Sequence, residues 1–210
     1  MTEPAEIASA LEPVADGVWH WRIHNAEIGG GISSSHAIRT TLDDGRIGCV
    51  LVDPVRLDGH AMQQLPHEVV AVVLTSRGHQ RSAWRIRRDH DAEVWAPEGC
   101  EGLDEDPDRR YEAGDDLPGG LVAIHTPGPE AVHYSLHLPS ADAVIVSDLV
   151  RRGDDLRLEF VPFEYHEDPL ATVASVRRLA NLGCSRLLLD HGAPNVEDGA
   201  RELAGLVDVG

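Results

Sequence analysis

The stretch LTSRGHQRSAWRIRRDH, residues 74–90, directly follows the apolar run Val69–Val73. A short run of β-branched and apolar residues predicts a buried strand. Apolar positions set among arginines over residues 80–90 predict a helix. The junction between the two carries Arg77, His79 and Arg81, so a group of polar side chains is expected where the strand ends.

Elements of the same kinds recur in two series along the chain. In the first half, strands are expected at residues 18–23, 36–41, 49–52, 69–74 and 94–96, with helices at 58–65 and 80–90. In the second half, strands are expected at 121–125, 134–138, 143–146, 156–161 and 187–189, with helices at 168–182 and 196–207. Gly29-Gly30-Gly31 and Asp43-Asp44-Gly45 are expected loops, the second a hairpin turn. Two β-rich series that end in helices predict an α/β (α+β) fold, a four-layer αββα sandwich of two mixed β-sheets flanked by helices.

Length and composition narrow the class of protein. The 210 residues suit one domain, 1–210, with its own core. No apolar stretch approaches the roughly 20 residues that span a bilayer, and the acidic N-terminus does not resemble a secretory signal, so a cytoplasmic location is expected. Cys49, Cys100 and Cys184 lie far apart and are expected to be buried thiols.

The chain is strongly acidic. Asp and Glu number 36 against 18 basic residues, all of them Arg, for a formal net charge of −18. Such a surface repels phosphate backbones and anionic lipid, so neither nucleic acid nor a membrane is an expected partner. Adaptation to high salt and a GC-rich genome that favours Arg codons both explain the excess.

Four short stretches with chemical character lie at expected strand ends. They are Val52-Asp53-Pro54, the Leu74-Thr75 start of the opening stretch, His125-Thr126-Pro127-Gly128, and the pair Ser147-Asp148 with Asp190-His191-Gly192. In this order, over nearly the whole chain, they resemble the metallo-β-lactamase superfamily. The resemblance implies that superfamily's αββα fold and a cluster of imidazoles and carboxylates that binds one or two divalent ions.

The expected ligand motif of the superfamily, HxHxDH after Leu-Thr, is largely replaced. Arg77 stands at the first His, Arg81 at the Asp and Ser82 at the final His, while Pro129 occupies the position of the His after Thr-Pro-Gly. Arg stays protonated and offers only donors, so it cannot ligate a cation. A standard dinuclear site is therefore excluded.

His79, Asp148 and His191 remain from the implied ligand set, which allows a mononuclear site with a bound water. The resemblance assigns His79 and Asp148 the catalytic roles. These ligand types suit Zn, Fe or Mn, so they do not fix the metal. By the same resemblance, the hydrolysed bond is an ester, thioester or lactone.

Four further residues are expected to contact a small-molecule substrate. Arg77 and Arg81 can recognise a carboxylate or phosphate, His133 lies close to the missing ligand at Pro129, and Tyr165 precedes the helix at 168–182. The alternative function is a metal-free pseudoenzyme that binds a small anionic ligand through Arg77 and Arg81. The sequence leaves the oligomeric state open, with a homodimer as one alternative.

Other histidines and the tryptophans have structural explanations. Alternation places His20 and Arg22 on the same face of the first strand, and we expect this face, with His24 and His36, to be solvated. The tryptophans, Trp19, Trp21, Trp84 and Trp95, are expected in the core.

The salt hypothesis makes a direct prediction for thermal stability. If the acidity reflects adaptation to salt, the unfolding midpoint measured by calorimetry rises between dilute buffer and about 1 M KCl, because screening relieves self-repulsion. A midpoint that stays constant or falls would contradict this hypothesis and favour genome composition.

Overall fold

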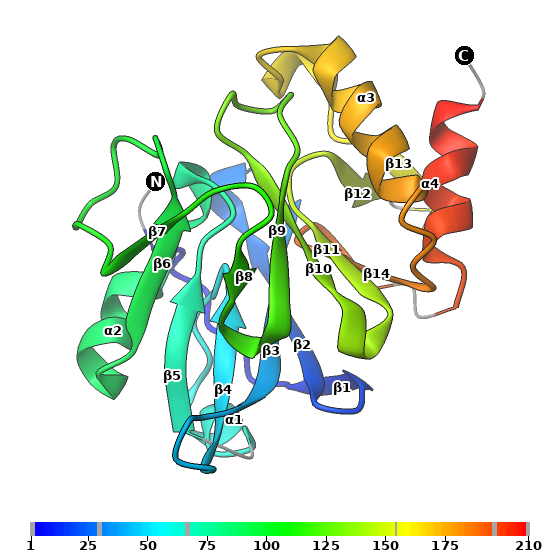
Figure 1. Cartoon of the computed structure of the whole chain (residues 1–210). Coiled ribbons are helices and arrows are strands. Elements are labelled where there is room, and N and C mark those ends of the chain that lie inside the picture. Colours follow the sequence, from blue (N-terminus) through cyan, green and yellow to red (C-terminus); the bar gives the residue numbers. More distant parts are fainter. Residues whose placement is uncertain (1–2, 29–30, 66–67, 154, 195–196, 209–210) are drawn as a thin grey trace.

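A computed structural model describes residues 3–28, 31–65, 68–153, 155–194 and 197–208 (Figure 1). The first half forms a seven-stranded sheet in the order β1-β2-β3-β4-β5-β6-β7. Its strands are β1 Glu12–Ala15, β2 Val18–Asn25, β3 Gly31–Thr41, β4 Ile47–Val52, β5 Glu68–Val73, β6 Glu93–Pro97 and β7 Arg109–Tyr111. Strands β1 to β4 pair antiparallel and β4 to β7 parallel, so the sheet is mixed.

The second half forms a five-stranded sheet in the order β14-β11-β10-β9-β8 and a separate two-stranded ribbon. The sheet comprises β8 Asp116–Leu117, β9 Leu121–His125, β10 Tyr134–Leu138, β11 Ala143–Val146 and β14 Arg186–Leu189. The ribbon comprises β12 Val150–Arg152 and β13 Leu158–Phe160. Strand β14 pairs parallel to β11 and the remaining pairs in the sheet are antiparallel, so this sheet is also mixed.

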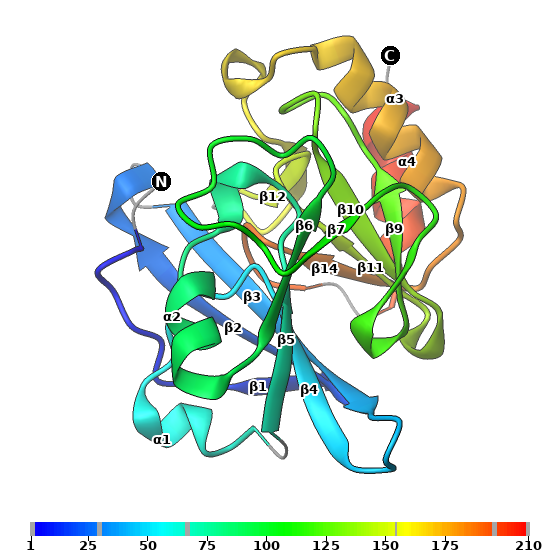
Figure 2. The ribbon, with the colours of Figure 1, turned by 60° about the vertical axis from the view of Figure 1, so that its left-hand side comes forward.

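Helices cover the outer faces of both sheets (Figure 2). They are α1 Gly59–Met62, α2 Ala83–His90, α3 Pro169–Ala180 and α4 Gly199–Val207. Short 3₁₀ segments lie at Ala26–Ile28, Arg77–His79, Pro118–Gly120, Pro139–Ala141 and Phe163–Tyr165. The predicted αββα sandwich is therefore confirmed.

Apolar residues fill three layers between these elements. One cluster packs α2 against the outer face of the first sheet, around Trp21 and Trp84. A second, around Val52 and Leu136, lies between the two sheets. A third, around Leu179 and Leu187, joins α3 and α4 to the second sheet. Both faces of each sheet are thus covered, which explains the near-continuous apolar runs of β4, β5 and β11.

Most predicted elements occur close to their expected positions. Strands β9, β10 and β11 have the predicted bounds, while β3 begins at Gly31 rather than at residue 36. Gly29 and Gly30 of the predicted first loop, and residue 196 of the predicted last helix, lie outside the described residues. Asp168 caps α3 by accepting bonds from the amides of Leu170 and Ala171.

The predicted solvated face of the first hairpin is wrong for two histidines. His20 and His36 are both fully buried, with ring centroids 5.3 Å apart, and face the space between the sheets. Burial lowers the pKa of His20 to about 4 and that of His36 well below its usual range. Alternation identified the shared face correctly but could not show that a second sheet covers it.

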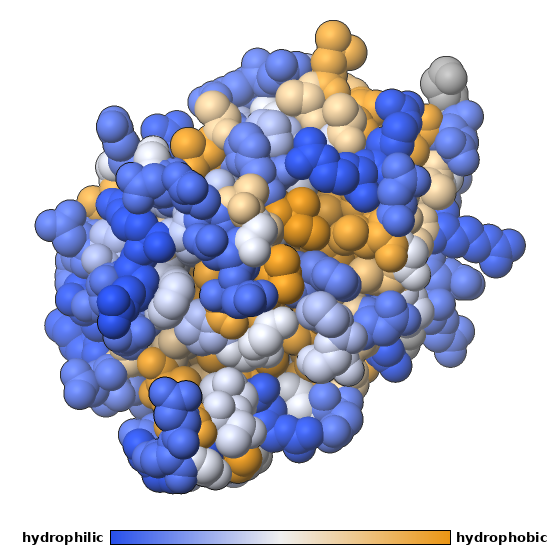
Figure 3. All heavy atoms as spheres, in the orientation of Figure 1, coloured by the Kyte–Doolittle hydropathy of each residue, from blue (hydrophilic) through white to orange (hydrophobic). Residues whose placement is uncertain are grey.

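The predictions of which cysteines and tryptophans are buried are confirmed in part. The three cysteines are buried, as are Trp21 and Trp84, whereas Trp19 and Trp95 are only partly buried. Leu170, in the first turn of α3, is 82% exposed. The face shown in Figure 3 carries mostly hydrophilic side chains, as the acidic composition requires. Within the described residues, no helix has the length and apolar character needed to cross a bilayer.

Two backbone hydrogen bonds join the sheets at the edge where several strands end. Ser34 in β3 donates to the carbonyl of Asp190 after β14, at 2.7 Å, and Tyr134 in β10 donates to the carbonyl of Thr75 after β5, at 3.0 Å. The carboxyl ends of β4, β5, β11 and β14 therefore meet at one edge of the sandwich. Ligand sites in α/β folds favour such an edge.

Gly128 fixes the loop between β9 and β10 against α3, and its replacement tests this packing. An added Cβ would lie 2.2 Å from Oγ1 and 2.6 Å from Cα of Thr172, and the residue has φ +143°. We expect Gly128→Ala to lower the free energy of unfolding in urea by about 1–3 kcal/mol. Gly205→Ala, in α4 with nothing within 4 Å of the new Cβ, should instead raise it by about 0.5–1 kcal/mol. Equal effects of the two substitutions would contradict the assigned packing.

Candidate metal centre

Polar side chains from four strand ends gather at the edge where the sheets are joined. Asp53 follows β4, His79 lies in the 3₁₀ segment after β5, Asp148 follows β11, and Asp190 and His191 follow β14. Each strand is fixed in register by its neighbours, so the positions of these residues are set by the sheets rather than by flexible loops.

His79 lies at the middle of this group and is almost fully buried. Its Nδ1 is 2.8 Å from Oγ of Ser147 and 3.0 Å from a carboxylate oxygen of both Asp53 and Asp190. Its Nε2 is 3.3 Å from Oδ1 of Asp148. Carboxylates accept hydrogen bonds and cannot donate them when ionised, so Nδ1 carries the proton and Nε2 is directed at Asp148.

His191 has the same orientation from the other sheet. Its Nδ1 lies 2.8 Å from the carbonyl oxygen of Ile32, which only accepts, and its Nε2 lies 2.7 Å from Oδ1 of Asp148. Ligand atoms of His79, Asp148 and His191 all lie within 4.8 Å of one another. The structure therefore brings together the three metal ligands predicted from the sequence.

Asp53 and Arg81 stabilise the buried side of the centre through hydrogen bonds. Asp53 accepts from the amide of Thr75 at 2.9 Å and from its hydroxyl at 2.5 Å. Arg81 donates through one nitrogen to the carbonyls of Ser34 and Asp53, at 2.7 and 2.8 Å. Both residues have left-handed backbone conformations, φ 45° for Asp53 and 35° for Arg81, which persist only when surrounding contacts hold them.

The charges of the centre are strongly coupled. Burial and the Arg81 charge oppose the imidazolium of His79, but the carboxylates of Asp148 and Asp53 outweigh them and hold its pKa well above the usual range. Burial opposes ionisation of Asp148, yet His79 and His191 hold its pKa well below the usual range. Burial, together with the charge of Asp53, raises the pKa of Asp190 to about 7, while His79 lowers that of Asp53 to about 2 against the effect of burial.

A second triplet, Asp53, His79 and Asp190, also has ligand atoms within 4.8 Å of one another. The side chains of this triplet are 0–4% exposed, whereas those of Asp148 and His191 are 30% and 15% exposed. A substrate and a bound water can reach the second pair only. The buried carboxylates instead orient His79 through its Nδ1, as carboxylates often orient ligating histidines.

The donor set of His79, Asp148 and His191 fits a divalent metal ion. Two ligand atoms at about 2.0 Å from a tetrahedral zinc ion lie roughly 3.3 Å apart. From Asp148 Oδ1, Nε2 of His79 lies at this separation, 3.3 Å, whereas Nε2 of His191 lies closer, at 2.7 Å, and both Nδ1 atoms face acceptors. The residues present therefore satisfy the chemistry of one ion.

The two arginines predicted to bind an anion do not form a pair. Arg81 is 6% exposed, with its guanidinium held by carbonyls beneath the centre. Arg77 is exposed and interacts with Glu130 at 3.2 Å. Arg77 thus remains available to a ligand at the surface, while Arg81 acts as the internal counter-charge for Asp53 and Asp190.

The other two residues predicted to contact a substrate lie at different depths. Tyr165 is 69% exposed, beside Phe163 at 42%. His133 is fully buried and burial lowers its pKa to about 4. Because its side chain is fully buried, His133 does not line an entrance to the centre.

Three residues of the centre were missing from the predicted site: Asp53, Ser147 and Asp190. Ser147 and Asp190 stand next to predicted ligands in the sequence, and all three stand at expected strand ends, a position that indicates supporting contacts.

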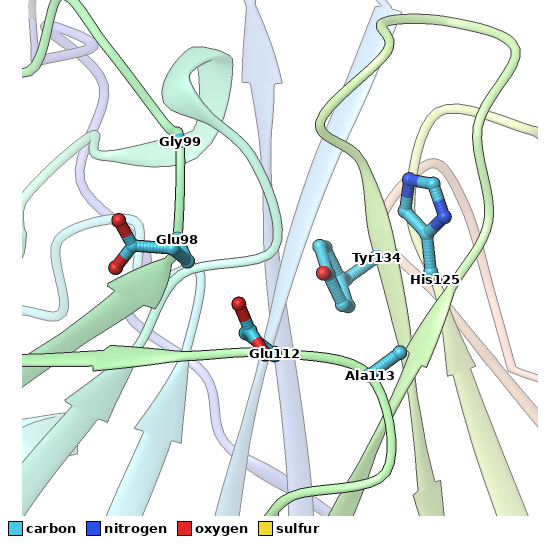
Figure 4. A pocket seen from close by; sticks show the side chains of 6 residues that line it. All are labelled: Glu98, Gly99, Glu112, Ala113, His125 and Tyr134. Carbon is cyan, nitrogen blue, oxygen red and sulfur yellow. The ribbon is translucent and has the colours of Figure 1, made fainter.

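A surface pocket of about 400 Å³ lies apart from this centre, and none of His79, Asp148 and His191 lines it. Its carboxylates, Glu98 and Glu112, come from one side, while Tyr134 and His125 come from the other (Figure 4). The pocket is wide open to solvent, so it lacks the enclosure expected of a catalytic cleft.

Comparison with known proteins identifies the class to which this fold and centre belong. The family model described as metallo-beta-lactamase superfamily matches residues 17–209. The chain therefore belongs to the metallo-beta-lactamase superfamily, and is a hydrolase-like protein of that fold.

Solved structures of this fold resemble the chain over nearly its full length. The metallo-beta-lactamase from Pontibacter korlensis is 15% identical with a TM-score of 0.73, covering 95% of this chain and 98% of that one. A metallo-beta-lactamase from Erythrobacter litoralis is 17% identical with a TM-score of 0.70, over 95% and 96%. The FIM-1 enzyme from Pseudomonas aeruginosa, solved in a mono-zinc form, is 15% identical with a TM-score of 0.69, over 98% and 97%. No curated protein matches the sequence.

The different environments of the two arginines predict different effects of substitution. Arg81→Met leaves buried carboxylates without their counter-charge and should lower the free energy of unfolding by about 3–5 kcal/mol. Arg77→Ala, at the surface, should change it by less than about 0.5 kcal/mol. Chemical denaturation of both variants measures these values. A near-neutral Arg81→Met would contradict the assigned role of Arg81.

Proposed function

We propose that the protein is a metal-dependent hydrolase with one divalent ion held by His79, Asp148 and His191. The observation that carries this proposal is the orientation of the two imidazoles. Both have Nδ1 against acceptors, and both direct Nε2 at the same carboxylate oxygen, Asp148 Oδ1. Each Nε2 therefore faces a carboxylate oxygen, a contact that needs a positive charge, supplied either by a proton on Nε2 or by a divalent ion between the two atoms.

When bound, the ion would polarise a carbonyl group and make a water molecule nucleophilic at neutral pH. Residues of the chain orient the ligands for this chemistry. Asp53 and Asp190 fix the ring of His79, and the Ile32 carbonyl fixes that of His191. Asp148, the most exposed of the three ligands, is placed to orient the attacking water by accepting a hydrogen bond from it.

The expected substrate is a small ester, thioester or lactone. Large apolar side chains are exposed on the segment that leads into α3, with Phe163 at 42%, Tyr165 at 69% and Leu170 at 82%. Exposed apolar side chains grouped in this way favour contact with an apolar ligand. Tyr165 and its neighbours therefore suit the acyl part of a substrate, and Arg77 suits a negatively charged end.

A metal-free binding protein is the second candidate function. The 2.7 Å separation of His191 Nε2 and Asp148 Oδ1 favours it, because this is the length of a direct bond between an imidazolium and a carboxylate. In that case the centre is a closed network of ion pairs, and Arg77 is the available group for an anion.

Elemental analysis of untagged protein, purified without added metal or chelator, separates the two functions. We expect about one equivalent of Zn, Fe or Mn in the wild type and in His137→Ala, a control in β10, and none in His191→Ala. The loaded wild type should hydrolyse members of an ester, thioester and lactone panel. Folded protein that stays metal-free after incubation with Zn²⁺ and Mn²⁺ would contradict the hydrolase and support the binding protein.

A further inference from the structure

The ligand segment, residues 190–193, follows β14 and carries His191. One side of this segment is fixed by β3. Ser34 in that strand donates its amide to the carbonyl of Asp190 at 2.7 Å and its hydroxyl to the carbonyl of Gly192 at 3.2 Å. Nδ1 of the His191 ring bonds to a carbonyl of the same strand at 2.8 Å. The first sheet therefore holds both the backbone and the ring of this residue.

The other side of the ligand segment lies against Arg152, the last residue of β12. The amide of Arg152 donates to the carbonyl of His191 at 2.9 Å, and its side-chain Nε donates to the carbonyl of Ala193 at 3.4 Å. A Cβ at Gly192 would lie 2.6 Å from Cβ and 2.8 Å from Cγ of Arg152. The stem of the arginine thus packs directly on the segment, at a position where only glycine permits so close an approach.

The guanidinium of Arg152 is fixed in turn by α4. Its Nη1 and Nη2 donate to the two carboxylate oxygens of Glu202, at 2.8 and 2.6 Å. The side chain of Arg152 is 9% exposed and that of Glu202 is 30% exposed. A bidentate pair of this kind fixes the orientation of the guanidinium as well as its position. The arginine therefore connects the ligand segment to a helix of the outer layer.

Strand β12 also follows the ligand Asp148 closely in the chain. Only Leu149, which is fully buried, separates the two, and its carbonyl accepts a bond from the amide of Val161 at 3.2 Å. The strand is thus linked to Asp148 through the chain and to His191 through Arg152. The separation of the two ligands, 2.7 Å between Asp148 Oδ1 and His191 Nε2, depends on the position of this three-residue strand.

We propose that Arg152, fixed by Glu202, is a positioning residue that holds Nε2 of His191 at Asp148. This inference rests on the proposed metal centre and deepens it. Arg152 acts through the backbone of the ligand segment, which it holds on the side opposite β3. Without the guanidinium, one side of the segment is released, and metal binding then has to order the ligand that the fold otherwise holds in place.

Two substitutions remove this contact from its two ends. Arg152→Met keeps most of the stem but removes the guanidinium, and Glu202→Gln keeps the shape of its partner but removes the charge. We expect both variants to bind Zn²⁺ about 10-fold more weakly than the wild type in competition with a chelator. Arg151→Met is the matched control, because the neighbouring arginine pairs with Glu159 at the surface, where their side chains are 44% and 46% exposed. This control should bind Zn²⁺ as the wild type does.

The ring ¹⁵N signals of His191 in the metal-free protein provide a readout that a loss of stability alone does not move. The signals are assigned by their absence in His191→Asn. In folded Arg152→Met and Glu202→Gln, we expect them to shift toward those of a solvated imidazole, because the contact with Asp148 is weakened. In Arg151→Met they should stay as in the wild type.

Wild-type ring signals of His191 in folded Arg152→Met and Glu202→Gln would overturn this proposal, whatever the stability of the two variants. A wild type that binds no Zn²⁺ would overturn the proposed hydrolase instead. The ring signals of the metal-free protein would then still decide whether Arg152 positions His191, so the two failures are distinguishable.

Discussion

The buried imidazole of His79, held between carboxylates from both sheets, is the contact on which the rest of the centre depends. Asp53 comes from the first sheet and Asp190 from the second, and each places an oxygen 3.0 Å from Nδ1. Two carboxylates, Asp53 and Asp190, are thereby packed with His79 and Arg81 where water is excluded. Removing one partner from such a group leaves a buried charge uncompensated, which is far more costly than losing a surface ion pair.

This constraint explains features that otherwise have no common cause. Arg81 adopts a left-handed backbone conformation because its guanidinium must reach the carbonyls of Ser34 and Asp53 beneath the imidazole. The two sheets are joined by backbone bonds at the same edge, next to Asp190 and Thr75. The replacement of the usual ligands by arginine therefore did not empty the site. The positive charge of Arg81 lies buried next to the carbonyls of Ser34 and Asp53, and the Nε2 atoms of His79 and His191 face Asp148.

Much of the architecture could be predicted from the sequence because both sheets are covered on both faces. Strands β9, β10 and β11 are short apolar runs bounded by polar or turn residues, and their bounds were predicted correctly. The three predicted ligands also proved to be neighbours, since each stood at a strand end of the same fold. The number of domains, the location and the oligomeric state stay predictions.

The remaining features depend on three-dimensional packing that periodicity cannot express. Alternation placed His20 on a face of its strand, but only the second sheet determines that this face is buried. Arg81 was expected to bind an anionic ligand because arginine can recognise a carboxylate or phosphate, but in the structure its guanidinium donates to the buried carbonyls of Ser34 and Asp53.

The most direct test of the metal centre is anomalous diffraction from crystals grown with Zn²⁺, recorded on both sides of the zinc edge. We expect one anomalous peak about 2.0 Å from Nε2 of His79 and of His191 and from a carboxylate oxygen of Asp148. A peak-free centre, in which His191 Nε2 bonds directly to Asp148, would contradict it and identify the site as a closed network of ion pairs.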